Sequence, residues 1–185
     1  MPPLHRNEQV NSVGGYFCYT ADGVFWGQTP GSNEIRIMNP GAEQNWTSSS
    51  EYTVMMNSQS LYGQSTQTIM SVMQNIANQA GVTTELRYGN FNDGSAYAAY
   101  NKDGRFIGIN LYSDGVVVGN FYDLYYTLVH ENVHATTNGY DSNMAEYMAY
   151  SAIYNGSDFN QCSMAFRMQV ESKWKYYANQ CGFPY

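Results

Sequence analysis

The sequence His-Glu-Asn-Val-His at positions 130–134 decides how the rest of this chain is interpreted. It lies in a stretch, residues 123–137, in which Leu124, Leu128 and Val133 recur at helical spacing. On a helix, side chains four positions apart lie one above the other, with about 5 to 6 Å between their Cβ atoms. The pattern therefore predicts a helix over this stretch that aims both histidine rings at one point.

Two imidazoles at this spacing, with a glutamate after the first, are typical of a catalytic zinc site. His130 and His134 are two of only 3 histidines in the chain. We expect both to bind Zn²⁺, while Glu131 projects to the side and acts as general base toward a zinc-bound water. The alternative is a pair of surface histidines on an amphipathic helix, without a metal.

The third ligand of such a site is less directly indicated by the sequence. A catalytic zinc takes three protein ligands and leaves a fourth position open. Glu146 is the best candidate, because a helix that opens near Ser142 would return its first turns alongside the motif helix. Asp141 is an alternative if the chain folds back more tightly, and Glu171 is a more distant one. His5 lies in a polar terminal segment and is a poorer candidate.

The flanking segments predict an α+β fold with a small, mainly antiparallel sheet, an early helix and a helical C-terminal half. The predicted elements before the motif are strands at 16–19, 24–26 and 35–38, a helix at 66–80, and strands at 83–88, 96–100 and 105–112. After the motif, one helix is capped by Asp141 or Ser142 and ends before Asn155, and a last helix runs from Asp158 to Ala178.

The length of the chain and the lack of a long linker or internal repeat predict a single domain over residues 1–185. Residues 1–60 are rich in strand and turn patterns, and residues 61–185 would form the catalytic core.

The composition excludes several classes of partner. A net charge of −7, with only 8 basic residues, argues against nucleic acid, because affinity for nucleic acid comes largely from Lys and Arg. The apolar runs are too short to cross a bilayer, which needs about 20 residues. Residues 1–8 lack the apolar stretch of a signal peptide, while a surface poor in charge suits an exported protein. Export would therefore need a larger carrier.

The cysteines give no metal-binding signal. Cys18, Cys162 and Cys181 lie far apart and form no Cys-x-x-Cys pair. Free buried thiols and a single disulfide both remain open.

The region from about residue 105 to residue 153 resembles the zincin metallopeptidases, specifically the glutamate-ligated group called gluzincins. The resemblance rests on the motif at 130–134, on Ala135 after it, and on Ala-Glu-Tyr-Met-Ala-Tyr at 145–150, which is similar to the Glu-x-x-Ala-Tyr segment of small bacterial zincins. It implies a zinc endopeptidase with Glu146 as third ligand. The spacing from the motif to Glu146 is shorter than in large thermolysin-like enzymes, and the metzincin extension is absent.

The resemblance also implies how substrate is held. Zincins bind a peptide as an added strand along a sheet edge, and residues 105–112 are the candidate edge, although an ordinary core strand is an equal alternative. Tyr140, Tyr147 and Tyr150 are candidates to donate a hydrogen bond to an oxyanion, or else packing residues. The competing functions are a zinc-braced binding or structural domain and an effector protease specific for one host protein.

A second resemblance concerns delivery. Residues 22–27 and 33–39 are similar to the start of C-terminal toxin domains of bacterial RHS-repeat polymorphic toxins. This resemblance implies a secreted effector that is carried by a larger chain and is blocked by an immunity protein.

Overall fold

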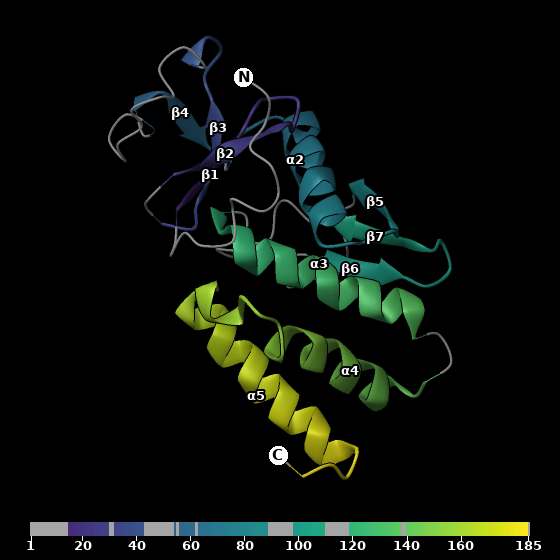
Figure 1. Ribbon diagram of the computed structural model, residues 1–185. Coiled ribbons are helices and arrows are strands. Elements are labelled where there is room, and N and C mark those ends of the chain that lie inside the picture. Colours follow the sequence, from purple (N-terminus) through teal and green to yellow (C-terminus); the bar gives the residue numbers. More distant parts are fainter. Residues whose placement is uncertain are drawn as a thin grey trace. The chain divides into compact units, whose positions relative to one another are not determined.

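The chain divides into two compact units in the computed structural model (Figure 1). The first unit comprises Met1–Ile76 and Val116–Phe121, and the second comprises Ala77–Gly115 and Tyr122–Tyr185. The structure describes residues 15–29, 32–42, 54, 56–61, 63–88, 98–109, 119–137 and 140–184. Within these residues the fold is α+β, as the sequence predicts, and the second unit carries the motif.

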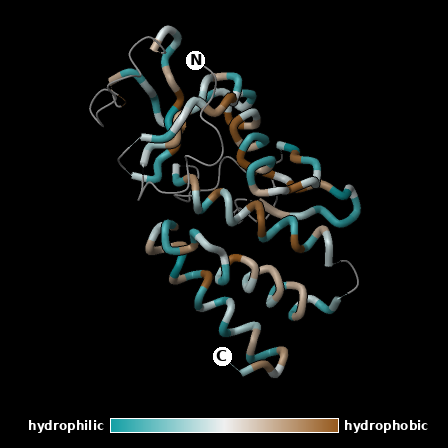
Figure 2. Tube along the Cα trace, in the orientation of Figure 1, coloured by the Kyte–Doolittle hydropathy of each residue, from teal (hydrophilic) through white to brown (hydrophobic). Residues whose placement is uncertain are grey.

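The first unit contains a four-stranded sheet in the order β2-β1-β3-β4. Its strands are β1 (Tyr16–Tyr19), β2 (Phe25–Thr29), β3 (Ile35–Met38) and β4 (Ser58–Ser60). The predicted hairpin between β1 and β2 is confirmed, and Gly23 supplies the positive φ of its turn at 82°. Helix α2 (Thr66–Gln79) buries Ile69, Val72 and Ile76 along one stripe, and Figure 2 shows hydrophobic residues recurring along it.

The second unit contains a three-stranded sheet in the order β5-β7-β6. Its strands are β5 (Glu85–Tyr88), β6 (Ala98–Asn101) and β7 (Phe106–Ile109). The hairpin of β6 and β7 confirms the prediction for these residues, whereas the predicted extensions at 96–97 and 110–112 lie outside the described residues.

The prediction of one small, mainly antiparallel sheet is wrong in the number of sheets and holds only in part for strand direction, since β1–β2, β3–β4 and β6–β7 pair antiparallel. There are two sheets, and each is mixed, because β1 pairs in parallel with β3 and β5 pairs in parallel with β7. Turn sequences specify only how strands joined by a tight turn pair. The parallel pairings of β1 with β3 and of β5 with β7 join strands that no tight turn connects. The side and direction of these pairings therefore depend on tertiary packing.

Three helices form the C-terminal half: α3 (Phe121–Thr136), α4 (Ser142–Tyr154) and α5 (Met164–Gln180). Asp141 is the N-cap of α4, with its side chain accepting from the Met144 N–H, and Asn155 is the C-cap. The chain after α4 passes through a short 3-10 helix, Phe159–Gln161, before α5. The last helix is therefore shorter than predicted.

The later start of α5 has a tertiary cause. Ser163 caps the helix by accepting from the Phe166 N–H, while its own N–H and hydroxyl donate to the two carboxylate oxygens of Asp123 at 2.8 and 2.6 Å. The predicted start at Asp158 is wrong because this contact with α3 fixes the cap at Ser163.

The helices of the second unit share an apolar core centred on Tyr126, Ile153, Cys162 and Val170. All three cysteines are free thiols, so no disulfide braces the described fold. Among the described helices, none combines the length and the apolar character needed to cross a bilayer.

Candidate metal centre

Helix α3 is oriented by its buried face and by two hydrogen bonds, one from strand β6 and one from Thr84, the residue before β5. Leu124 and Leu128 are 3% and 0% exposed. Asn132 Oδ1 accepts from Thr84 Oγ1 at 3.1 Å, and Glu131 Oε2 accepts from the Tyr100 N–H on β6 at 2.7 Å. Because these bonds come from consecutive positions of the motif, they hold α3 in one rotation about its axis.

The two motif histidines converge as the helical spacing predicts. The Nε2 atoms of His130 and His134 lie 3.0 Å apart, and the ring centroids are separated by 4.7 Å. The side chains are 12% and 19% exposed, so both rings are largely shielded from solvent. This arrangement is the one required for two ligands of a single ion.

Glu146 from α4 completes the group. Its Oε2 lies 3.6 Å from His130 Nε2, and its Oε1 lies 3.5 Å from His134 Nε2. Ligand atoms of the three residues all lie within 4.8 Å of one another. His130, His134 and Glu146 therefore lie close enough to hold a metal ion.

The alternative third ligands are used elsewhere. Asp141 caps α4 through a 2.9 Å bond to the Met144 N–H. Glu171 pairs with Lys175 on α5 at 2.6 Å. Neither belongs to the metal-binding group found in the described part of the chain, and His5 lies outside the described residues.

The electrostatics of the centre favour cation binding. Burial and the neighbouring His130 lower the pKa of His134, against the opposing effect of Glu146. Burial works to raise the pKa of Glu146, but the hydrogen bond and charge of His130, together with His134 and Lys173, lower it overall. A neutral imidazole and an ionised carboxylate are the forms that bind a metal.

Glu131 is buried beside the centre, at 9% exposure. Burial raises the pKa of this carboxyl group to about 7, although the charge of His130 and the Tyr100 N–H act in the opposite direction. A group whose pKa lies near the working pH is well suited to exchange protons. In the part of the chain that the structure describes, no hydrogen bond occupies Oε1 of Glu131.

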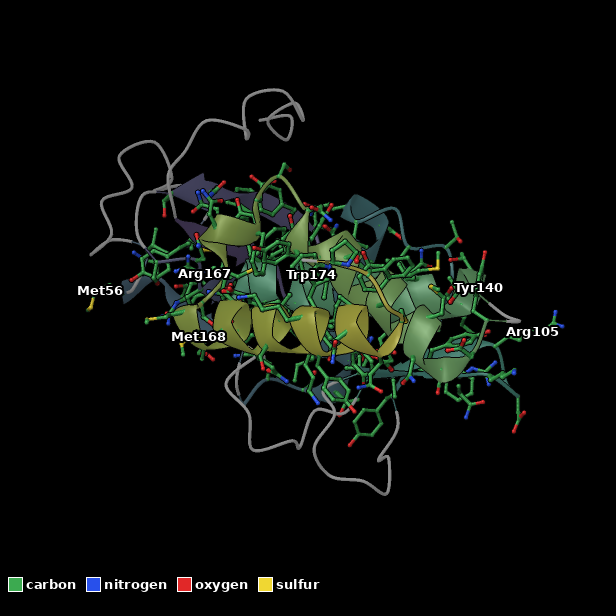
Figure 3. All side chains as sticks on the ribbon, turned by 90° about the horizontal axis from the view of Figure 1, so that it is seen from below. Met56, Arg105, Tyr140, Arg167, Met168 and Trp174 are labelled. Carbon is green, nitrogen blue, oxygen red and sulfur yellow. The ribbon has the colours of Figure 1, made fainter. Side chains whose placement is uncertain are left out.

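The three candidate tyrosines differ in their contacts and in their exposure to solvent. The Tyr150 ring packs edge-on against His130, with 4.5 Å between centroids, and stacks on Tyr177. Tyr147 instead stacks on Phe183 at 4.8 Å. Tyr140 is 59% exposed, and Figure 3 shows it at one end of the helical layer, whereas Trp174 lies along the middle of α5. Only Tyr150 of the three lies against a motif histidine.

A cavity of about 270 Å³ adjoins the centre. It is lined by Ala98, Thr127, His130, Glu131, Tyr150, Ile153, Phe166, Gln169, Val170 and Lys173. Gln169 and Lys173 are not predictable as site residues from the sequence, because the helical pattern of α5 indicates the packed face of the helix but not the cavity that it lines.

The predicted substrate edge is wrong for the described residues. Strand β7 is the central strand of its sheet, and β5 and β6 are the edges. The alternative of an ordinary core strand is the correct one for Phe106–Ile109, of which Ile107 and Ile109 are 0% and 2% exposed. β6 is the edge that lies at the motif, through the bond from Tyr100 to Glu131.

Comparison with known proteins supplies no relative for this arrangement. No family model matches the chain, and no curated protein or solved structure is significantly similar to it.

Proposed function

We propose that this chain is a zinc-dependent hydrolase that cleaves peptide bonds. The observation that carries the proposal is the convergence of His130, His134 and Glu146 beside the buried carboxyl group of Glu131. Two imidazoles and one carboxylate form the ligand set of a large class of catalytic zinc sites.

The distances between ligand atoms support zinc. Bonds of roughly 2.0 to 2.2 Å in a tetrahedral site separate ligand atoms by about 3.3 to 3.6 Å. The separations here are 3.0 Å between the histidine nitrogens and 3.5 and 3.6 Å from these to Glu146. The three side chains could thus hold zinc with only small adjustments of their rotamers.

The number of ligands supports catalysis over bracing. Structural zinc sites are closed by four protein ligands, whereas catalytic sites have three and an open position. Among the residues that the structure describes, the group contains three, and a cavity lies next to it. A substrate carbonyl and a water could reach the centre from that cavity.

The residues of the chain suggest a mechanism. When bound, zinc would polarise a substrate carbonyl and make a water more acidic. Glu131 takes a proton from the attacking water and passes it to the leaving amine. The backbone N–H of Tyr100 holds one oxygen of this carboxylate, so that the other can face the reaction. The Tyr150 hydroxyl donates to the oxyanion that develops.

The experiment that tests the proposal uses Glu131→Gln. This variant should keep one equivalent of zinc but hydrolyse a diverse peptide library at least about 100-fold more slowly, because the proton acceptor is lost. Glu171→Gln is the matched control, since Glu171 lies in an exposed ion pair on α5. Zinc content is measured by elemental analysis. Turnover by Glu131→Gln at the wild-type rate would contradict the mechanism.

A further inference from the structure

The cavity beside the centre has two kinds of wall. Ala98, Ile153, Phe166 and Val170 supply apolar surface, which suits the methylene groups of a side chain. The polar lining residues that are not part of the motif or paired with it are Thr127, Gln169 and Lys173. A ligand that fits this cavity should therefore be apolar along its length and polar at one end.

The size of the cavity limits what it can take. Pockets for whole small molecules usually measure about 300 to 1,000 Å³. At about 270 Å³, this cavity lies near the lower end of that range and has room for one extended side chain.

Apart from the motif residues His130 and Glu131, the charged residue that lines the cavity is Lys173. Lys173 is the only Lys or Arg among the lining residues. Its neighbour on α5, Lys175, is paired with Glu171 at 2.6 Å and does not line the cavity. The chain as a whole carries a net charge of −7, so any attraction for an acidic group must be local.

We propose that Lys173 makes this cavity a specificity pocket for a substrate side chain that ends in a carboxylate, so that glutamate is preferred over glutamine. The inference rests on the proposed peptidase function and names the substrate class of that site. The apolar walls hold the methylene groups, and the Lys173 ammonium pairs with the carboxylate. Gln169 can donate a hydrogen bond to either a carboxylate or an amide and so contributes little to the choice.

Lys173 has a second candidate role, which the test must separate from this one. Its charge also acts on Glu146 and favours the ionised carboxylate. A lysine that served only Glu146 would change metal affinity and the cleavage of all peptides alike. A lysine that contacts the substrate side chain changes the ratio of kcat/KM between two peptides of the same size that differ in charge.

The experiment compares zinc-loaded wild type, Lys173→Met and Lys175→Met on a quenched fluorescent peptide library. Each position in turn carries glutamate or glutamine, which differ in charge but hardly in size. At one position the wild type should cleave the glutamate peptide with a kcat/KM roughly two- to fivefold higher, as is typical of a partly exposed ion pair. This preference should decrease as salt is raised.

Lys173→Met should lose the preference while retaining zinc, and Lys175→Met should keep it. Zinc content and thermal unfolding of both variants establish that they fold. If the wild type cleaves library members but Lys173→Met leaves the ratio of glutamate to glutamine unchanged, the pocket assignment is overturned and the hydrolase proposal stands. If the zinc-loaded wild type cleaves no member of the library, both the pocket assignment and the hydrolase proposal are contradicted.

Discussion

The carboxylate of Glu131 on α3 accepts a 2.7 Å hydrogen bond from the backbone N–H of Tyr100 on β6, 31 positions earlier in the chain. This bond ties the predicted general base to the edge strand of the sheet. The glutamate of the motif thus has a structural role as well as the proposed chemical one, and the two roles can be separated by substitution.

Glu131→Gln and Glu131→Ala should differ in stability. Glutamine keeps an oxygen that accepts from the Tyr100 N–H, whereas alanine leaves this donor without its partner. An unsatisfied buried donor costs about 1 to 3 kcal/mol. The free energy of unfolding of the metal-free protein, measured in urea, should therefore be lower by about this amount for alanine than for glutamine. Equal stabilities would mean that the bond contributes nothing.

Glu146→Ala should weaken zinc binding by more than about 100-fold, since loss of a mere supporting partner already costs 10- to 100-fold. Isothermal titration calorimetry measures this change. Zinc at 100 times its dissociation constant should also raise the unfolding free energy of the wild type by about 2.7 kcal/mol, an increase that a chelator reverses. Glu171→Ala is the control. An equal loss of zinc affinity in this variant would contradict the proposal that Glu146 is a metal ligand.

Tyr150→Phe should slow turnover by roughly 100-fold without loss of zinc, because it removes one donor to the oxyanion but keeps the ring against His130 and Tyr177. Steady-state kinetics with a peptide substrate measure the effect. Tyr147→Phe is the matched control, since the Tyr147 ring stacks on Phe183. A similar decrease in both variants would indicate a general packing effect instead.

Asp123 should make stability depend on pH. Burial raises its pKa, although hydrogen bonds from Ser163 and Cys162 oppose this shift. Between the unfolded value of about 3.9 and the raised native value, the folded protein binds more protons than the unfolded chain, so stability falls as pH rises.

Thermal unfolding at a series of pH values tests this expectation. Asp123→Asn should flatten the profile in that window, because the amide does not titrate and can still accept from Ser163. Asp103→Asn, at an exposed position, should leave the profile unchanged. A steeper decrease of stability with pH in Asp123→Asn than in the wild type would contradict the predicted direction of the Asp123 contribution.

Local patterns were sufficient for the hairpins and for most helix boundaries. The turn around Gly23 and the Asp141 cap lie where the sequence predicts them, because both depend on residues within a few positions of each other. The start of α5 was wrong because Ser163 is fixed by Asp123, 40 positions earlier. The central position of β7 was missed because periodicity does not specify which strand pairs on its second side. Delivery within a larger bacterial protein stays a prediction.

The sequence by itself determined the motif helix and the convergence of His130 and His134, because four positions on one helix impose their separation. Only the tertiary structure decided among Glu146, Asp141 and Glu171, since the path of α4 against α3 sets which carboxylate reaches the histidines. It also brought Tyr100 to Glu131 and Lys173 to the cavity. These contacts join elements distant in sequence, and their geometry comes from the packing of the core and not from any local repeat.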